Sequence, residues 1–343
     1  MEYNAKNTTM LSGKITKALR HISRLAVLVC LLSASVLAHP GSGIVVDRLG
    51  QIYFLDTGSG LWKLDARGSI SHLSPLRNHW LAIDAGDKFT QSRLPADAGR
   101  DWVITAVASN PTLLISTDFP LTMGPDGNLY YPSVRENNVR ILRKSPTGNA
   151  SAFATLPRSV AGAALGWING ITTAPDGSIY YTEDSAVRRI TAQGRISTVA
   201  TVPALAHGPA IPGNEKHPYL RGLKIDANGT VYVADSGDAR VLKITPDGKI
   251  ATLLQLESPW APTDVALFDD VVYVLEFLHT IEEDRLAWMP RIRKITPDGK
   301  SAVILTVDQM PGARPAKTAA TVSYNSFSAD VLQLVFQYLF RFV

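Results

Sequence analysis

Several residues of this 343-residue chain stand where short apolar segments begin, and their types could bind a small molecule. Arg221 and Asn169 each precede a glycine at such a start, in RGLKI and NGITT. A guanidinium can grip a carboxylate through two parallel hydrogen bonds, and an amide both donates and accepts. We therefore expect Arg221 to hold an anionic group and Asn169 to hydrogen-bond to the ligand. Three further ligand-binding candidates stand close to these segments: Asp118, Asp264 and Trp167.

Two residues are candidates for proton transfer. His79 precedes the segment WLAID, and Glu276 follows the segment VVYVL. An imidazole titrates near neutral pH, and a positioned carboxyl can serve as an acid or a base. Side-chain oxygens of Asn169, Asp118 and Glu276 are also the kind of ligand that a divalent cation such as calcium takes. These three residues are therefore the candidate metal ligands.

Each of these residues also has a structural interpretation. Arg221 could pair with Glu276 or Asp264 and join neighbouring parts of the fold, and Trp167 could be buried between sheets. Acids elsewhere are followed by an arginine five residues on, as in Asp235 with Arg240. That spacing predicts an ion pair across a tight hairpin.

Charge argues against a nucleic-acid partner. The net charge of +4 comes from residues 1–38, which hold five Lys or Arg and one Glu, so the remainder has a charge of 4 − (5 − 1) = 0. No basic run follows. The sequence also lacks a glycine-rich phosphate loop, a nucleophile elbow and an HExxH motif.

A repeat organises the chain. One turn signal is an Asp-Gly or Asn-Gly type turn before a Tyr-containing segment, as in DRLGQIYF, GPDGNLYY, APDGSIYY and DANGTVYV. A second signal recurs at Gly68, Gly148, Gly194, Gly248 and Gly299, with spacings of 80, 46, 54 and 51. The spacing of 80 leaves room for a degenerate unit near residues 76–117, which makes six units. Four short strands per unit, repeated every 40–50 residues, are typical of a propeller blade. The predicted fold is an all-β, six-bladed β-propeller of four-stranded antiparallel blades over residues 39–307.

These phrases resemble those of NHL-repeat propellers and of the calcium-dependent lactonase propellers of the senescence-marker/gluconolactonase family. The resemblance covers roughly residues 41–307 and implies a divalent cation at the mouth of a central channel. Asn169-Gly170 matches the phrase that supplies one metal ligand in the lactonases. Arg221 stands where their aspartate is expected, and Ser42 stands where their glutamate is expected.

Three functions remain open from these residues. The first is binding of a small polar or anionic ligand at one channel mouth. The second, implied by the resemblance, is a metal-dependent lactonase or esterase-type hydrolase. The third is a protein-interaction platform of the NHL type, which would add a protein partner.

Strand parity places the variable segments together. In an up-and-down blade, the start of the first strand and the end of the second lie at one end of the sheet. Three long segments, 157–167, 203–219 and 277–290, connect at that end. We expect them to surround a pocket over the channel.

The chain begins with a predicted signal peptide over residues 1–38, with Met10 as an alternative start. Basic residues precede an apolar run, 25–38, that ends in small residues. We therefore expect export to the periplasm or the extracellular space, with no membrane contact apart from this segment. Cys30, the sole cysteine, lies inside the run, so the exported part would have no disulfide. Residues 308–343 form a predicted tail with an apolar end that packs on the propeller or meets a partner.

Overall fold

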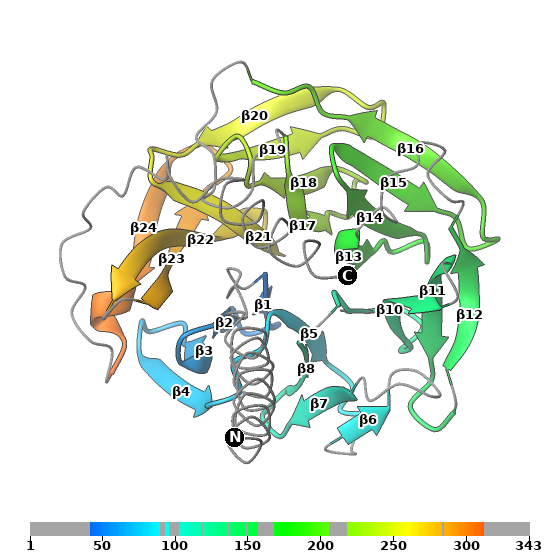
Figure 1. The fold of residues 1–343 in the computed structure, drawn as a ribbon, viewed down its shortest axis with the longest axis horizontal. Coiled ribbons are helices and arrows are strands. Elements are labelled where there is room, and N and C mark those ends of the chain that lie inside the picture. The colour runs from blue at the N-terminus through cyan, green and yellow to red at the C-terminus, as the bar shows by residue number, and fades with distance from the viewer. Residues whose placement is uncertain are drawn as a thin grey trace, which may run out of the picture. The chain divides into compact units, whose positions relative to one another are not determined.

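The computed structural model describes residues 42–89, 93–95, 103–117, 119–135, 138–148, 150–156, 168–205, 218–282 and 285–311. These residues form six four-stranded antiparallel sheets around a central axis, and one short 3-10 helix (Figure 1). The predicted six-bladed β-propeller is confirmed. Among the described residues, no helix is both apolar and long enough to cross a bilayer.

The first three blades have the following strands. Blade 1 contains β1 (Ile44–Val46), β2 (Ile52–Asp56), β3 (Gly60–Leu64) and β4 (Ile70–Ser74). Blade 2 contains β5 (Trp80–Asp84), β6 (Arg93–Pro95), β7 (Val103–Val107) and β8 (Thr112–Ser116). Blade 3 contains β9 (Thr122–Met123), β10 (Leu129–Arg135), β11 (Asn138–Lys144) and β12 (Ala150–Thr155).

The remaining three blades follow in the same way. Blade 4 contains β13 (Ile168–Thr173), β14 (Ile179–Glu183), β15 (Ala186–Ile190) and β16 (Ile196–Thr201). Blade 5 contains β17 (Leu220–Ile225), β18 (Val231–Asp235), β19 (Arg240–Ile244) and β20 (Ile250–Gln255). Blade 6 contains β21 (Trp260–Phe268), β22 (Val271–Glu282), β23 (Arg285–Ile295) and β24 (Ser301–Thr306), and the 3-10 helix η1 (Val307–Gln309) follows.

Blade 2 is the degenerate unit predicted near residues 76–117, and its strand order differs from the others. Five sheets follow chain order, whereas blade 2 has the order β5-β8-β7-β6. The chain therefore passes from the inner strand to the outer one and returns inward. All pairs remain antiparallel. β8, the last strand of blade 2 along the chain, runs antiparallel to the inner strand β5. It therefore ends at the same end of the propeller as that at which the first strand of blade 3 begins.

The recurring turn phrase is explained by one aspartate per turn. Asp47 accepts hydrogen bonds from the backbone N–H of Leu49 and Gln51, at 2.8 and 2.9 Å, and from the Tyr53 hydroxyl at 3.1 Å. Gly50 between them has φ of 75°, a backbone conformation that glycine adopts without strain. The phrase D-x-x-G-x-x-Tyr thus fixes both the turn and the strand that follows it.

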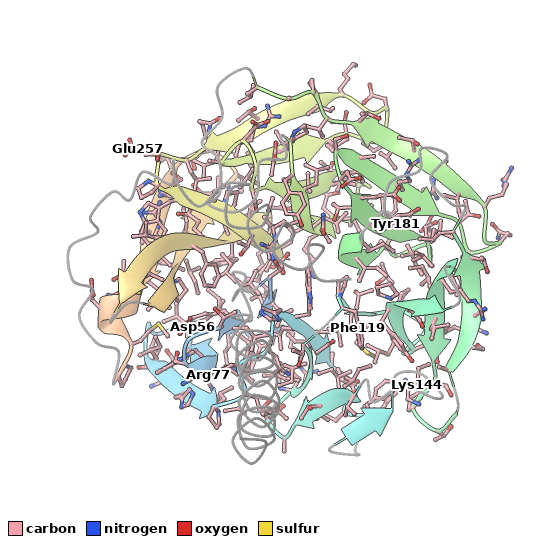
Figure 2. All side chains as sticks on the ribbon, viewed as in Figure 1. Asp56, Arg77, Phe119, Lys144, Tyr181 and Glu257 are labelled. Carbon is pink, nitrogen blue, oxygen red and sulfur yellow. The ribbon has the colours of Figure 1, made fainter. Side chains whose placement is uncertain are left out.

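The space between every two adjacent blades is filled by one apolar cluster, giving six clusters in the described residues. Successive residues of a second strand serve opposite neighbours, so that Phe54 packs toward blade 6 and Tyr53 toward blade 2. Tyr181 and Tyr131 are also buried in such clusters. Figure 2 shows Tyr181 within this packing. The ring is closed by the blade 6–blade 1 cluster rather than by a shared sheet.

The predicted segment 277–290 is not an irregular loop. It is a β-hairpin in which β22 and β23 pair from Val272↔Ile295 to Glu282↔Arg285. Sequence reasoning missed the hairpin because the tip, EEDR, lacks the glycine that marked the other turns. The predicted loop 157–167 and most of 203–219 lie outside the described residues. The predicted signal segment, 1–38, and residues 312–343 of the predicted tail lie outside them as well.

Candidate functional site

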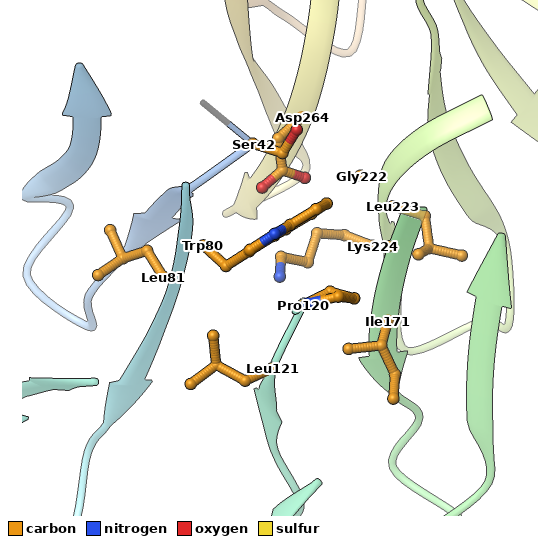
Figure 3. Close-up of a pocket in the computed structure, with 11 residues that line it drawn as sticks. Ser42, Trp80, Leu81, Pro120, Leu121, Ile171, Gly222, Leu223, Lys224 and Asp264 are labelled. Carbon is orange, nitrogen blue, oxygen red and sulfur yellow. The ribbon is translucent and has the colours of Figure 1, made fainter. Parts of the chain in front are cut away.

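The first strands of all six blades, or the residues just before them, line one pocket on the central axis (Figure 3). Its volume is about 240 Å³, part of which is open to solvent, and the enclosed part has room for about one water-sized group. Each blade contributes at least one lining residue, among them Ser42, Trp80, Pro120, Gly170, Lys224 and Asp264.

Glycines near the starts of the first strands allow neighbouring blades to approach one another closely around the pocket. A Cβ built at Gly170 would lie 2.4 Å from the carbonyl oxygen of Arg221, and one at Gly43 would lie 2.9 Å from Leu81 Cβ. At Gly222 the Cβ would lie 1.9 Å from Asp264 Oδ1. A glycine at this position of blades 1, 4 and 5 therefore narrows the channel. The carboxylate of Asp264, at the equivalent position of blade 6, occupies the space beside Gly222.

Asp264 is 5% exposed and has no arginine or lysine in ion-pair contact among the described residues. Its Oδ1 accepts from the Val265 N–H at 2.8 Å, and its Oδ2 accepts from the Ile44 N–H at 3.3 Å. Burial raises the pKa of Asp264 to about 6, against the opposing effect of Lys224 and of its hydrogen bonds. The carboxyl group therefore changes its charge close to neutral pH.

Lys224 and Ser42 complete the polar lining. Figure 3 shows the Lys224 side chain, the Trp80 indole and the Asp264 carboxylate converging on the pocket from β17, β5 and β21. Lys224 has no hydrogen bond or ion pair with any described residue. The Ser42 hydroxyl is buried, at 2% exposure of the residue, and has no hydrogen-bond partner among the described residues. A buried hydroxyl left without a partner is unfavourable by about 1–3 kcal/mol, so a bound group at this place would remove a cost.

Arg221, the predicted anion anchor, is 8% exposed. Burial lowers its pKa, while Tyr219 and Asp264 act in the opposite direction. Its carbonyl oxygen accepts from the Thr182 hydroxyl at 2.8 Å, which links blade 5 to blade 4. Arg221 therefore acts on Asp264 electrostatically, but the expected ion pair between them is not formed, and Lys224 is the cation among the residues that line the pocket.

Asn169 links blade 4 to blade 5 through both ends of its amide. Its Nδ2 donates to the Leu220 carbonyl oxygen at 3.0 Å, and its Oδ1 accepts from the Tyr219 hydroxyl at 3.2 Å. The amide oxygen that a cation would need is thus already an acceptor within the protein. Asn169 is buried, and its contacts hold the strand starts of two blades together.

Glu276, predicted as a catalytic acid or base and as a metal ligand, is fully buried. It accepts hydrogen bonds from Arg291 and, at 2.7 Å, from Arg293. The Arg291 guanidinium also lies 3.7 Å from the ring centroid of Trp260. Both arginines come from β23 of the same blade, so the partner of Glu276 is not Arg221.

The ion pair of Glu276 has counterparts in two other blades. The predicted pairs Asp235 with Arg240 and Glu183 with Arg188 are both present, at 2.8 and 2.7 Å. Arg240 also donates to Asp238 at 3.2 Å and to the Pro203 carbonyl oxygen at 2.7 Å. These pairs stabilise the ends of the blades.

The other predicted site residues are placed as follows. His79 Nδ1 lies 2.8 Å from the Thr117 carbonyl oxygen, and the backbone of His79 bonds to Ser42 N–H. Its neighbour Trp80, rather than His79, lines the pocket. Asp118 and Trp167 lie outside the described residues.

The described side chains at the channel mouth do not fit the cation of the lactonase-type propellers. The Asn169 oxygen has a protein donor, a guanidinium stands at residue 221, and residue 42 offers a hydroxyl in place of a carboxylate. Within the described part of the chain, no three His, Cys, Asp or Glu side chains are grouped to hold a metal. We therefore derive no chemistry through a metal.

Sequence reasoning missed Lys224. A signal for Lys224 was nevertheless present in the repeats. The blades can be aligned on the glycine at the channel mouth, or on the residue that replaces it, and the residues two positions later can then be compared. Blades 1, 3, 4 and 6 have Val45, Thr122, Thr172 and Ala266 there, and Lys224 is the one charged residue of the set.

Comparisons with known proteins agree with this architecture. Residues 121–271 match the family model of the SMP-30/Gluconolactonase/LRE-like region. Mouse teneurin-3 is 24% identical over 258 residues, which are 66% of this chain and 9% of teneurin-3, so this chain spans a small part of that protein's length.

Two solved structures are similar at low identity. A gluconolactonase from Xanthomonas campestris is 12% identical with a TM-score of 0.46, over 69% of this chain and 84% of its own. Regucalcin from Agrobacterium tumefaciens, described as a calcium-binding protein, is 16% identical with a TM-score of 0.45, over 69% and 81%. The match over residues 121–271, within a six-bladed propeller, confirms the resemblance of this chain to the senescence-marker/gluconolactonase propellers.

Proposed function

We propose that this protein binds a small anionic or polar ligand at one mouth of its central channel. The observation that supports this most strongly is the pocket on the axis. Lys224 and Ser42 both line it, and the Ser42 hydroxyl has no hydrogen-bond partner among the described residues. An ammonium is a compact cation with three donors, and it suits a carboxylate or a similar anion. Because the enclosed space is narrow, the ligand enters with a small charged group and keeps the rest of its body outside.

Trp80 and Arg221 have supporting roles in this proposal. The Trp80 indole forms an apolar wall of the pocket, and a wall of this kind excludes water from the ion pair that a ligand would make with Lys224. Arg221 adds a second positive charge close to Asp264. Among the described residues that line the pocket, Lys224 is the cation, which favours an anionic ligand.

Formate is a suitable probe, because it is a carboxylate of minimal size. Titration of ¹³C-formate, followed by its NMR line width, should show saturable binding to the wild-type protein. Lys224→Met removes the cation that would pair with formate, so it should weaken the binding at least about tenfold. A tenfold loss corresponds to about 1.4 kcal/mol of binding free energy. Lys243→Met is the matched control, because Lys243 lies over the Tyr232 ring on an outer part of blade 5. Equal binding by the two variants, or no binding to the wild type, would overturn the proposal.

A lactonase-like hydrolase is the second candidate, and the family match over residues 121–271 favours it. A screen of small lactones and esters with added divalent cations tests it. Turnover that is lost in Asn169→Ala would support hydrolysis by a mouth site of the family type. Binding of formate without turnover of any substrate in the screen would leave the binding function.

We also propose that the protein acts outside the cytoplasm. The support is the sequence of residues 14–38, in which basic residues precede an apolar run that ends in small residues. N-terminal sequencing of the protein from fractionated cells should give a start near His39 in the exported fraction. Recovery of the intact chain from the cytosol would contradict export.

A further inference from the structure

Asp264 is held in the channel by neutral groups. A register shift in β21 between Pro262 and Asp264 brings the carboxylate against the backbone of Gly222. Its two oxygens accept from the backbone N–H groups of Val265 and Ile44. Both bonds favour the ionised form of the carboxyl group, but burial outweighs them and raises its pKa.

Among the described residues, the two charged groups that act on Asp264 both come from β17. Lys224 and Arg221 act on Asp264 electrostatically and favour its ionised form. The segment just before β1 and the strand β5 contribute the neutral side chains of Ser42 and Trp80 to the pocket. An ionised Asp264 therefore compensates part of the positive charge that would attract a ligand.

A ligand anion and an ionised Asp264 would compete for the same space. The enclosed pocket admits about one water-sized group, and Asp264 lines it together with Lys224 and Ser42. Two acidic groups in one narrow, desolvated pocket cannot both be ionised without a large free-energy penalty. The ligand is anionic at neutral pH, so the group that gives up its charge is Asp264.

We propose that anion binding in this pocket takes up a proton on Asp264, so that the site fills in mildly acidic surroundings and empties toward neutral pH. This coupling rests on the proposed function of the pocket. The proton binds an oxygen of Asp264, and Lys224 then balances the charge of the bound anion. The raised pKa of Asp264, about 6, places the transition where a modest change of pH can act on it. The site would thus release its ligand on passing from an acidic to a neutral compartment.

Formate titrations at two pH values test the coupling. If formate binds only the form with protonated Asp264, its affinity should be about 30-fold higher at about pH 5 than at about pH 7.5. Formate itself stays ionised over this range. Asp264→Asn should bind with the same affinity at both pH values. Thermal unfolding establishes that the variant is folded.

A measurement on the wild type alone keeps the test independent of any variant. Calorimetric titration in two buffers of different ionisation enthalpy should give an uptake of about 0.9 proton per formate at about pH 7. Binding that depends on Lys224 but takes up no proton and has one affinity at both pH values would overturn the coupling and leave the proposed function standing. Absence of formate binding at either pH would overturn both.

Discussion

The carboxylate of Asp264 in blade 6 occupies the space that a side chain at residue 222 in blade 5 would fill, and the glycine at that position leaves this space open. A Cβ at residue 222 would lie 1.9 Å from Asp264 Oδ1, 2.3 Å from its Cγ and 2.7 Å from its Cβ. Contacts this short cannot be relieved by a small shift. The polar group that we place in the channel therefore depends on a glycine in the neighbouring blade.

Gly222→Ala should destabilise the protein by about 1–3 kcal/mol, because the new methyl group displaces the Asp264 carboxylate and the strand that carries it. Urea unfolding measures the effect. Gly86→Ala is the matched control, since a Cβ there would meet the flexible end of Lys88 at 3.2 Å and little else. Adding Asp264→Ala to Gly222→Ala should recover part of the loss. A Gly222→Ala protein as stable as Gly86→Ala would show that the two residues do not interlock.

Asp264 should also make stability depend on pH. Its pKa in the folded protein is raised from 3.8 to about 6 by burial, so the folded state binds its proton more tightly than the unfolded state. The contribution to stability is complete below the unfolded pKa and is lost as the pH rises through the folded one. Between about pH 7.5 and pH 5, the wild type should gain roughly 1–1.5 kcal/mol relative to Asp264→Asn. Denaturant unfolding of both proteins at the two pH values measures this difference. If Asp264 contributed nothing, the free energy of unfolding would change with pH by the same amount in the wild type and in Asp264→Asn.

Arg240 should be far more important for folding than a surface arginine. It pairs with Asp235 and Asp238, whose side chains are both fully buried. Arg240→Met removes the cation that these two buried carboxylates share and should cost about 3–5 kcal/mol. Arg189→Met removes the exposed pair with Asp176 and should cost at most about 1 kcal/mol. Similar losses in the two variants, measured by urea unfolding, would rule out the buried network as the cause.

Calcium should have little effect on this propeller. The Asn169 oxygen already accepts a hydrogen bond from Tyr219, and Arg221 brings a positive charge to the mouth. A cation that binds the folded protein, present at a free concentration of about 100 times its dissociation constant, would raise the free energy of unfolding by about 2.7 kcal/mol. A thermal scan detects a change of this size readily. We expect no such rise with added calcium. A rise that disappears in Asn169→Ala would show that the family's metal site has been retained.

The repeat in the sequence was sufficient to predict the blades, and local turn chemistry explains why. Asp47, Gly50 and Tyr53 define a turn and a strand within seven residues, so each copy is visible without knowledge of the whole fold. The strand order of blade 2 could not be predicted this way. It depends on which strands pair across the sheet, and β5 pairs with β8 after an excursion of 27 residues from Ala85 to Pro111.

The contacts of the candidate site residues could not be predicted in the way that the blades were. The mouth positions Asn169, Arg221 and Glu276 were identified by alignment of the repeats, but their side chains contact other blades or strands of the protein itself. Whether a polar side chain meets a ligand or a neighbour depends on the packing between blades, which no local phrase encodes. Lys224 was missed because it lies within a strand, where a lysine usually points to solvent.

A crystal structure obtained in the presence of bromide would test the central claim most directly. Bromide is a small monovalent anion whose anomalous signal identifies its position. We expect a peak in the channel pocket within about 3.5 Å of Lys224 Nζ and near the Ser42 hydroxyl, stronger in crystals at about pH 5 than at pH 7.5. Bromide peaks confined to the outer surface at both pH values, with none beside Lys224, would contradict the assignment of the channel as an anion site.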